Sequence, residues 1–403
     1  PASGPKPLMG AFIKAATLKG AGLPRWLQAM YVDHYFAECV LVGGARRAAR
    51  MSTKHWSDPT VLDFITVKRP IEYAGKTVKE ITLMRATGMN PFGFLWSANN
   101  SVAVDEEFWE LVNTPEMPLE ASKHPETPLA NKWMLAKKVF ELVCEASYGD
   151  GTGEPGFINV HKLVQNDEGW KGLHLGDYVG SKKYQPNEDT TLLLSRLAKR
   201  AKKKRYHTIT NPCGEIALNL LGGYCVIADV VPFHAETLDE AEEAFRVATR
   251  ALIRVNLMDS LYDKEVKRTN RIGVGITGIH EFAFKFFGLG FADLVNEKKS
   301  KGFWLTLRRF SDAVREEAIA YSAKVGLPTP HTLTTIKPAG TTSKLFGLTE
   351  GWHLPSMRHY LRWVQFRNDD PLVAAYAAFG FPTRELTSYA GTTIVGFPTA
   401  PVI

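Results

Sequence analysis

Segments with helical periodicity alternate with short apolar segments along this chain, and this alternation restricts the fold more than any other feature. Residues 133–146 and 237–255 carry apolar side chains at spacings of three and four, which is typical of amphipathic helices. The second segment opens with Thr237 and Glu240, at the spacing of a capping box. Alternation of this kind predicts an α/β fold. We expect its strands at residues 101–104, 225–231, 271–279 and 393–397.

The composition is that of an ordinary globular protein. Of the 403 residues, 45% are hydrophobic and 23% are charged, which excludes a disordered or fibrous chain. No apolar run approaches the roughly 20 residues that a membrane helix needs, and the first residues do not resemble a signal peptide. Four cysteines are too few for a disulfide scaffold, so we expect a protein of the reducing cytoplasm.

The net charge of +7 favours anionic partners only weakly. Much of the basic character lies in the run KRAKKKR at residues 199–205. This run is either a solvated helix end or a patch for phosphate or nucleic acid. Only Tyr206 adjoins it, which argues against a stacking platform for single strands.

The segment TNPCGEIALNLLGGYC, residues 210–225, contains the most informative chemistry. In an extended loop, residues two apart project to the same side, so Asn211, Cys213 and Glu215 could converge on one small ligand. A buried thiol beside a carboxylate is a poor ionic nucleophile, because both burial and the negative charge raise its pKa. This arrangement argues against a cysteine hydrolase. Hydrogen-atom chemistry does not need a thiolate and remains open.

Cys225 follows Cys213 by twelve positions. The two lack the further Cys or His ligands that a zinc site requires, and we expect no metal bound by the protein itself. Cys225 taken alone is equally compatible with a core position. Cys39 and Cys144 are expected to be core thiols, the latter on the apolar face of the predicted helix at 133–146.

NPCGEI followed by a second cysteine resembles the finger loop of ribonucleotide reductases, in particular the adenosylcobalamin-dependent class II enzymes. Seven other segments, collinear over nearly the whole chain, resemble the monomeric branch that reduces ribonucleoside triphosphates. They are ASGPKPL (2–8), VGGARRAA (42–49), WSANNSVAVD (96–105), GEPGFIN (153–159), NRIGVGITGI (270–279), TTIKPAGTTSKLFGLTEGWHLP (334–355) and LRWVQFRNDDPLV (361–373).

The resemblance implies an α/β fold of a particular kind: a ten-stranded α/β barrel of the ribonucleotide-reductase and glycyl-radical type. We expect residues 1–403 to form a single catalytic domain, with a finger loop at about 209–224 threading its centre. The family's second redox cysteine lies upstream of the SGP block, and its C-terminal cysteine pair has no counterpart here. We therefore expect a chain without the N-terminal strands and C-terminal tail: a trimmed chain, one piece of a split enzyme, or a reduced variant.

The resemblance also assigns roles to individual residues. Cys213 would carry the thiyl radical that takes the 3′ hydrogen of the ribose, after homolysis of the cobalt–carbon bond of adenosylcobalamin. Glu215 would act as general base on the 3′ hydroxyl. Asn211 would hold the ribose hydroxyls, and Cys225 would be one member of the dithiol pair that supplies two electrons.

A phosphate-binding loop is expected at PAGTTS, because its backbone amides and hydroxyls follow an apparent strand without an acidic residue. The alternative is an ordinary Gly/Thr turn. By the same resemblance, Ser3 and Gly4 would face the substrate. The loop residues are Pro338, Ala339, Gly340, Thr341, Thr342 and Ser343.

The implied reaction is reduction of a ribonucleotide, with preference for the triphosphate, by a thioredoxin-like or other dithiol reductant. A deoxynucleotide effector and a complementary polypeptide are further partners that the resemblance suggests. The alternatives are a non-autonomous piece of a split reductase, a class I large subunit that needs a separate radical-generating subunit, and a nucleic-acid-binding role for 199–205. Neither a Tyr-Tyr pair nor a glycyl-radical loop is visible, which favours class II.

Overall fold

The computed structural model describes most of the chain as two compact units. The first comprises residues 1–165 and 363–397, and the second comprises residues 166–362 and 398–403. The single domain expected over 1–403 stays a prediction. The described residues are 4–20, 22–42, 46–69, 95, 97–149, 153–165, 188, 192–193, 195–196, 199–200, 208–219, 223–260, 263–340, 342–352, 359–386 and 391–400.

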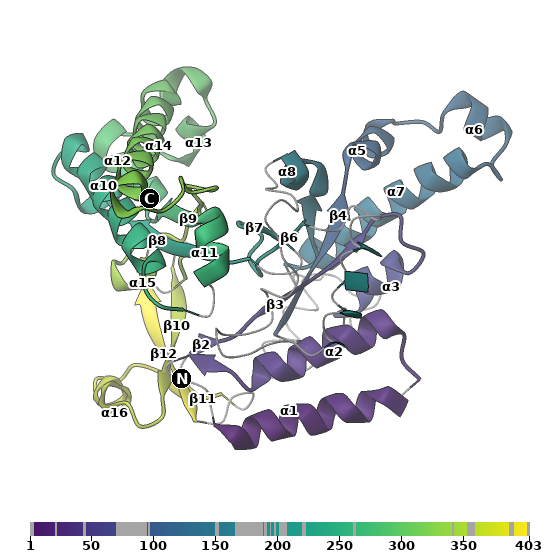
Figure 1. The fold of residues 1–403 in the computed structure, drawn as a ribbon, viewed down its shortest axis with the longest axis horizontal. Helices are drawn as coiled ribbons and strands as arrows, with labels where there is room; N and C mark the ends of the chain where they lie inside the picture. Colours follow the sequence, from purple (N-terminus) through teal and green to yellow (C-terminus); the bar gives the residue numbers. More distant parts are fainter. Residues whose placement is uncertain are drawn as a thin grey trace. The chain divides into compact units, whose positions relative to one another are not determined.

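A parallel sheet organises the first unit (Figure 1). Strand β4 (Ala98–Val104) lies between β3 (Arg50–His55) and β5 (Gly156–Asn159), with Lys54 opposite Val102 and Val102 opposite Phe157. Because parallel strands need a crossover, helices lie between them in the chain. These helices bury Trp56, Phe108 and Val139 against β4. They are α3 (Val61–Thr66), α5 (Glu106–Asn113), α6 (Leu119–Lys123), α7 (Pro128–Cys144) and the π-helical turn η3 (Glu145–Gly149). Helix α8 (Val160–Gln165) follows β5.

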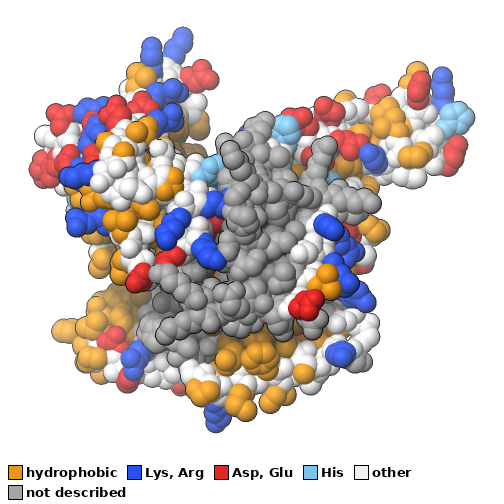
Figure 2. Space-filling view, viewed as in Figure 1, with side chains coloured by type: hydrophobic (Ala, Val, Ile, Leu, Met, Phe, Trp, Pro, Cys, Tyr) orange, Lys and Arg blue, Asp and Glu red, His pale blue; other side chains and the backbone are white. Residues whose placement is uncertain are grey.

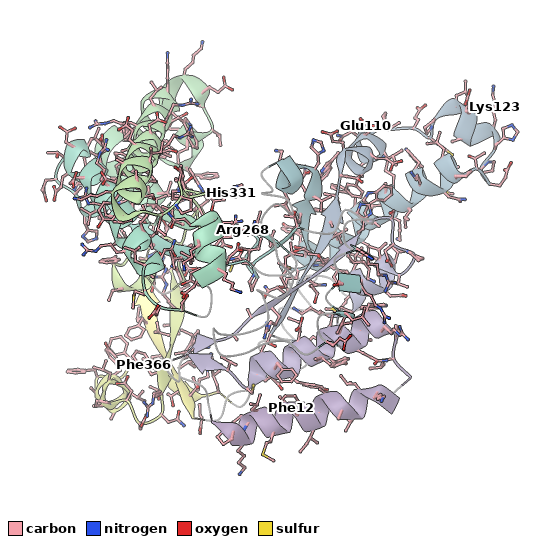
Figure 3. The ribbon with its side chains drawn as sticks, in the orientation of Figure 1. Phe12, Glu110, Lys123, Arg268, His331 and Phe366 are labelled. Carbon is pink, nitrogen blue, oxygen red and sulfur yellow. The ribbon has the colours of Figure 1, made fainter. Side chains whose placement is uncertain are left out.

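Two helices precede this sheet in the chain. They are α1 (Pro5–Thr17), which the short η1 (Leu18–Gly20) extends, and α2 (Arg25–Glu38). Phe12 of α1 meets Phe36 of α2 edge-on, with 4.9 Å between the ring centroids (Figure 3). Other apolar side chains of α1 are exposed, and Figure 2 shows them along this helix. The strand pair β1 (Leu41–Val42) and β2 (Arg46–Arg47) follows α2.

A separate three-stranded sheet closes the described chain, in the order β10–β12–β11. It consists of β10 (Tyr360–Arg367), β11 (Thr383–Glu385) and β12 (Thr392–Thr399). Helix α16 (Pro371–Ala378) joins β10 to β11, and Asp370 caps it by accepting a hydrogen bond from the Leu372 N–H. The rings that pack between this helix and the sheet are Phe366 (Figure 3), Tyr376, Phe381 and Phe397.

The second unit is built on two parallel strands, β8 (Val226–Val230) and β9 (Ile272–Ile276). Every residue of β9 is buried, and segment 332–335 runs along its other edge, where Val274 pairs with Thr334. The His331 N–H donates to the Thr269 carbonyl at 2.8 Å, which fixes the start of that segment (Figure 3). The helices around these strands are η5 (Pro232–His234), α10 (Leu238–Asn256), α11 (Asp263–Thr269), α12 (Ile279–Phe287), α13 (Phe291–Leu294), α14 (Glu297–Val325) and α15 (Thr342–Leu345).

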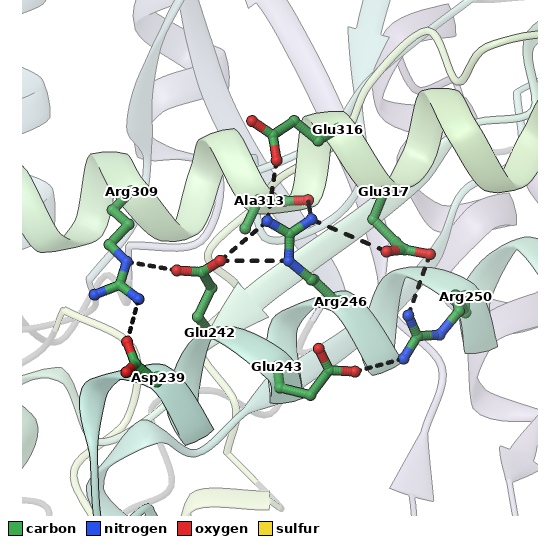
Figure 4. Close-up of polar contacts among 9 residues, drawn as sticks. All are labelled: Asp239, Glu242, Glu243, Arg246, Arg250, Arg309, Ala313, Glu316 and Glu317. Atoms are coloured by element: carbon green, nitrogen blue, oxygen red, sulfur yellow. Dashed lines mark hydrogen bonds and ion pairs between the residues drawn. The ribbon is translucent and has the colours of Figure 1, made fainter.

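Helices α10 and α14 pack through an apolar seam that an ion-pair ladder borders (Figure 4). Phe245 stacks on Phe310 in the seam, with ring centroids 4.8 Å apart. On the outer side, Arg246 bonds Glu242 of its own helix and Glu316 of α14, each at 3.0 Å. Exposed ion pairs contribute at most about 1 kcal/mol each, so the buried rings supply most of this contact's stability.

The expected elements are confirmed, with one error in a side chain. Thr237 caps α10 by accepting the Glu240 N–H at 3.1 Å, as the spacing predicted. Cys39 is buried as expected, but the expectation for Cys144 was wrong because this thiol is exposed at the end of α7. The buried stripe of that helix runs through Ala136, Val139 and Val143. Cys144 follows Val143 directly, and each step along a helix rotates the side chain by about 100°, so Cys144 lies off the stripe.

The class is mixed α/β, as expected, but the described strands form five small sheets and not a closed barrel. The ten-stranded barrel therefore stays a prediction. None of the helices in the described part of the chain is both long and apolar enough to cross a membrane.

Candidate functional site

The finger-loop segment forms a β-hairpin in the second unit. Strands β6 (Thr208–Thr210) and β7 (Ala217–Asn219) are antiparallel, with Thr210 opposite Ala217. The connecting loop was expected to be extended, but it turns instead. The Gly214 N–H donates to the Asn211 carbonyl at 2.9 Å, with proline after Asn211 and Gly214 at a φ of 82°. Proline and glycine at these positions favour such a turn.

The side chain of Asn211 closes this loop from within. Its Oδ1 accepts a hydrogen bond from the Ile216 N–H at 3.0 Å, and the backbone N–H of Asn211 donates to the Ile216 carbonyl at 3.1 Å. Cys213, near the tip of the turn, is exposed. Because the loop turns, two-residue spacing alone does not bring Asn211, Cys213 and Glu215 to one side. The oxygen of Asn211 is engaged, which makes its amide nitrogen the end that can donate to a ligand.

Glu215 holds the most unusual polar atom of the loop. Its Oε2 is buried and has no hydrogen-bond partner among the described residues. Its backbone carbonyl accepts a hydrogen bond from the Thr335 Oγ1 at 3.0 Å, and the neighbouring Ala217 carbonyl accepts from Arg271 Nη1 at 2.9 Å. These two contacts hold the hairpin against β9 and segment 332–335. A buried carboxylate oxygen without a partner calls for an explanation, and a ligand hydroxyl is one.

Cys225 lies close enough to Glu215 for the two groups to interact electrostatically. Burial raises the pKa of the Cys225 thiol to about 12, and the charge of Glu215 adds to the increase. The positive charge of Arg271 and a hydrogen bond with Thr332 oppose the increase. At neutral pH, Cys225 is therefore a protonated thiol. The structure thus brings together Glu215 and Cys225, and it adds Arg271 and Thr332, which the sequence reasoning missed.

Two glycines of β9 allow segment 332–335 to approach this closely. A Cβ atom at Gly275 would lie 2.4 Å from the Thr335 carbonyl oxygen, and one at Gly273 would lie 2.5 Å from the Thr335 side chain. Both distances are below any real contact, so side chains here would displace the segment. The IGVGI pattern therefore indicates a close backbone approach, a signal that sequence reasoning could have used.

The predicted phosphate loop follows segment 332–336 directly. Ala339 is buried with a φ of 51°, which bends the chain sharply, while Pro338 and Gly340 are half-buried. Ser343 is completely buried, so its hydroxyl does not face solvent. Thr341 lies outside the described residues.

Side chains from outside the motif surround this loop. The Thr342 Oγ1 donates to the Asp229 Oδ2 at 2.7 Å, and Lys337 pairs with the same oxygen at 2.9 Å. Neither Asp229 nor Lys337 was predicted. The position of a lysine directly before the loop was the available signal.

The remaining predictions fall elsewhere. Gly4, at a φ of 91°, precedes α1 in the first unit, and Ser3 lies outside the described residues. Of the basic run 199–205, Lys199 and Arg200 are described, and both are exposed. All four cysteines are described, and no disulfide joins any two of them.

Comparison with known proteins shows similarity over nearly the whole chain. No family model matches. The adenosylcobalamin-dependent ribonucleoside-triphosphate reductase of Lactobacillus acidophilus is 27% identical over 98% of this chain and 46% of its own length. Its counterpart in Lacticaseibacillus paracasei is also 27% identical, over 98% of this chain and 45% of its own length. The chain thus spans about half the length of the curated relatives it matches.

A solved structure agrees at the level of the fold. The crystal structure of a B12-dependent (class II) ribonucleotide reductase matches the whole chain and 47% of its own, with a TM-score of 0.57 at 23% identity. The similarity is thus found in both the sequence and the fold, and it agrees with the motifs quoted above. The chain is thus similar in sequence to adenosylcobalamin-dependent ribonucleoside-triphosphate reductases, and its fold is similar to that of a class II ribonucleotide reductase.

Proposed function

We propose that the protein reduces ribonucleotides, with triphosphates as the preferred substrates, to 2′-deoxyribonucleotides by a thiyl-radical mechanism that depends on adenosylcobalamin. The relatives that bear this activity in their names match nearly all of this chain. The observation that carries the proposal is the buried Glu215 Oε2, which has no partner among the described residues. This oxygen can accept the proton of a ribose 3′ hydroxyl.

The residues of the loop fit a radical cofactor. The Cys213 thiol is exposed, as access by a group the size of a corrin requires. When bound, adenosylcobalamin supplies radical chemistry through homolysis of its cobalt–carbon bond. As a thiyl radical, Cys213 takes the 3′ hydrogen atom of the ribose. Asn211 donates its amide N–H to a ribose hydroxyl, and Glu215 accepts the 3′ hydroxyl proton.

Cys225 acts as a hydrogen donor in this proposal. Its raised pKa keeps the thiol protonated at neutral pH, so that it can donate a hydrogen atom and does not attack as a thiolate. Reduction at C2′ releases the hydroxyl as water and needs two electrons. Cys225 and a second thiol supply them and end as a disulfide. A thioredoxin-like or other dithiol reductant then restores the two thiols.

The same proposal covers the finer points of architecture and partners. We assign the substrate phosphates to loop 338–343, and we expect the finger loop at 209–224 to enter a ten-stranded barrel in the complete catalytic assembly. A complementary polypeptide is a further partner in this proposal. A deoxynucleotide effector would set base preference, and a reducing cytoplasm would keep the thiols reduced.

The test is anaerobic incubation of the protein with adenosylcobalamin, a ribonucleoside triphosphate and dithiothreitol, with chromatography of the products. We expect deoxynucleotide in the wild type and none in Cys213→Ser. Glu215→Gln keeps the shape of the side chain and removes its charge, so it should lower turnover by about 100-fold or more. Deoxynucleotide formation that survives Cys213→Ser would contradict the mechanism. Absence of product both alone and with the N-terminal strands of a relative supplied would contradict the function.

A further inference from the structure

A single buried carboxylate ties down both ends of the predicted phosphate loop. Asp229 lies near the carboxyl end of β8, and its side chain is completely buried. Its Oδ2 forms an ion pair with Lys337 Nζ at 2.9 Å and accepts a hydrogen bond from Thr342 Oγ1 at 2.7 Å. Lys337 directly precedes the loop 338–343, and Thr342 lies near its end. The carboxyl ends of parallel strands are where α/β sheets bind ligands, so this carboxylate occupies a functional position in the sheet.

The strand pairing places this carboxylate beside a glycine. Asp229 is paired in register with Gly275 of β9, and a Cβ at Gly275 would lie 3.4 Å from the Asp229 Oδ1. That Oδ1 is buried and has no hydrogen-bond partner among the described residues. An ionised carboxylate that is only half satisfied is costly to bury, so stability alone is a poor reason for its presence.

The two partners of Asp229 have different prospects as phosphate ligands. Thr342 donates its only hydroxyl proton to Asp229, so it cannot donate to a phosphate at the same time. Lys337 pairs with Asp229 through its ammonium group, which carries three N–H donors, and 27% of its side chain is exposed. Its remaining donors and its charge are therefore available beside the loop. A lysine in this position is a point charge well suited to a polyphosphate.

We propose that Lys337 is a ligand of the substrate's polyphosphate and that Asp229 is the positioning residue that holds Lys337 and Thr342 in place for it. The inference rests on the proposed function, since it assigns new residues to the phosphate loop of that site. It predicts an unusual direction for the change in phosphate affinity when Asp229 loses its charge. A carboxylate near phosphates repels them, so a bystander at this position would weaken binding, and its removal would tighten it. A positioning residue does the opposite.

The experiment is calorimetric titration of the purified protein with inorganic tripolyphosphate, a ribonucleoside triphosphate and the corresponding nucleoside. Lys337→Met should weaken binding of both polyphosphates by about 10- to 100-fold, the usual effect of a charge-assisted hydrogen bond, and leave nucleoside binding unchanged. Asp229→Asn should also weaken both polyphosphates, by about 5- to 10-fold, although it removes a negative charge. Lys285→Met is the matched control, because Lys285 in α12 donates to the carbonyls of Phe233 and Ala235 and lies over the rings of Phe233 and Phe286, away from the phosphate loop in the chain.

A second pair of variants keeps the test decisive if Asp229→Asn does not fold. Thr342→Val loses the hydroxyl bond to Asp229 and should weaken tripolyphosphate, whereas Thr342→Ser keeps the bond and should restore affinity. In turnover, Lys337→Met should raise KM and change kcat by no more than about threefold, because it removes a contact made equally in ground and transition states.

Tighter or unchanged polyphosphate binding in Asp229→Asn would overturn the positioning role of Asp229. An equal loss of affinity for nucleoside and triphosphate in this variant would also overturn it, because Asp229 would then only maintain the local structure. Unchanged affinity in Lys337→Met, or no binding of tripolyphosphate by the wild type, would overturn the inference as a whole. Deoxynucleotide formation is scored separately. If the variants weaken polyphosphate binding but the protein forms no deoxynucleotide, the reductase function is refuted and this inference stands. If the protein forms deoxynucleotide but the variants bind polyphosphate normally, this inference is refuted and the reductase function stands.

Discussion

The protonation state of Cys225 gives the most direct test of the site, through the pH dependence of its alkylation. Iodoacetamide reacts with thiolates, so its rate with a given cysteine follows the thiolate fraction. A pKa of about 12 leaves about one thiolate in ten thousand at pH 8, against roughly one in four for an ordinary thiol of pKa about 8.5. Cys225 should thus react about three orders of magnitude more slowly than a simple thiol, before any steric protection is counted.

The shape of the pH profile separates the pKa from steric protection. The logarithm of the rate should rise by about one for each pH unit from about 8 to 10.5 for Cys225, because its pKa lies above this range. An exposed cysteine in a short peptide with blocked ends should level off above about pH 9. Burial that merely blocks the reagent would lower the whole curve without moving its plateau. The assay is quantitative mass spectrometry of the Cys225 peptide after timed exposure.

A charge variant checks the cause. Burial is the main reason for the raised pKa and Glu215 adds to it, so Glu215→Gln should lower the pKa and shift the Cys225 curve toward lower pH. Because folding raises this pKa, the thiol contributes stability that is complete below the pKa of the unfolded chain and is lost as pH rises toward about 12. A Cys225 plateau near pH 9, or a curve that Glu215→Gln leaves in place, would refute this electrostatic reasoning.

Four other substitutions test the chemistry and the packing. Cys213→Ser should abolish deoxynucleotide formation without lowering the thermal unfolding temperature, since the thiol is exposed; residual product would remove it from the radical role. Gly275→Ala should lower stability by about 1–3 kcal/mol, because its Cβ would lie 2.4 Å from the Thr335 carbonyl oxygen. Gly302→Ala, whose Cβ meets nothing closer than 3.8 Å within α14, should raise stability by about 0.5–1 kcal/mol; equal effects in the two melting curves would count against the close approach. Asn270→Ala should cost about 2–4 kcal/mol in denaturant unfolding, because it breaks buried hydrogen bonds at a residue with a φ of 42°, and a loss under about 1 kcal/mol would contradict this.

Local elements of this fold could be read from the sequence because local rules determine them. Thr237 and Glu240 mark the start of α10, and both are hydrogen-bonded there: the Thr237 hydroxyl accepts the Glu240 N–H, and the Glu240 carboxylate accepts the Glu236 N–H. Strands β8 and β9 were visible as apolar runs. Cys144 was misplaced because the apolar stripe of α7 ends at Val143, and periodicity does not say where a stripe stops.

The finger loop shows the limit of local rules for a site. Its residue types were recognisable, but its geometry was expected to be extended. The same residues contain the opposite signal, since Asn211 followed by proline, with Gly214 two positions later, favours a turn. That turn exposes Cys213 and commits the Asn211 oxygen to the backbone. Hydrogen bonds within the loop, and not strand pleating, therefore set its geometry, and the convergence of Asn211, Cys213 and Glu215 on one ligand stays a prediction.

The electrostatics of the site lie beyond any local rule. The pKa of Cys225 depends on Glu215 in the hairpin loop, on Arg271 at the start of β9 and on Thr332 on the far edge of that strand. These residues span more than 100 positions of the chain and meet only because Gly273 and Gly275 let segment 332–335 lie against β9. A lone cysteine beside a glutamate in the sequence would be compatible with either a thiolate or a thiol. The packing decides for the thiol, and a protonated thiol is the form from which a hydrogen can be delivered to a substrate radical.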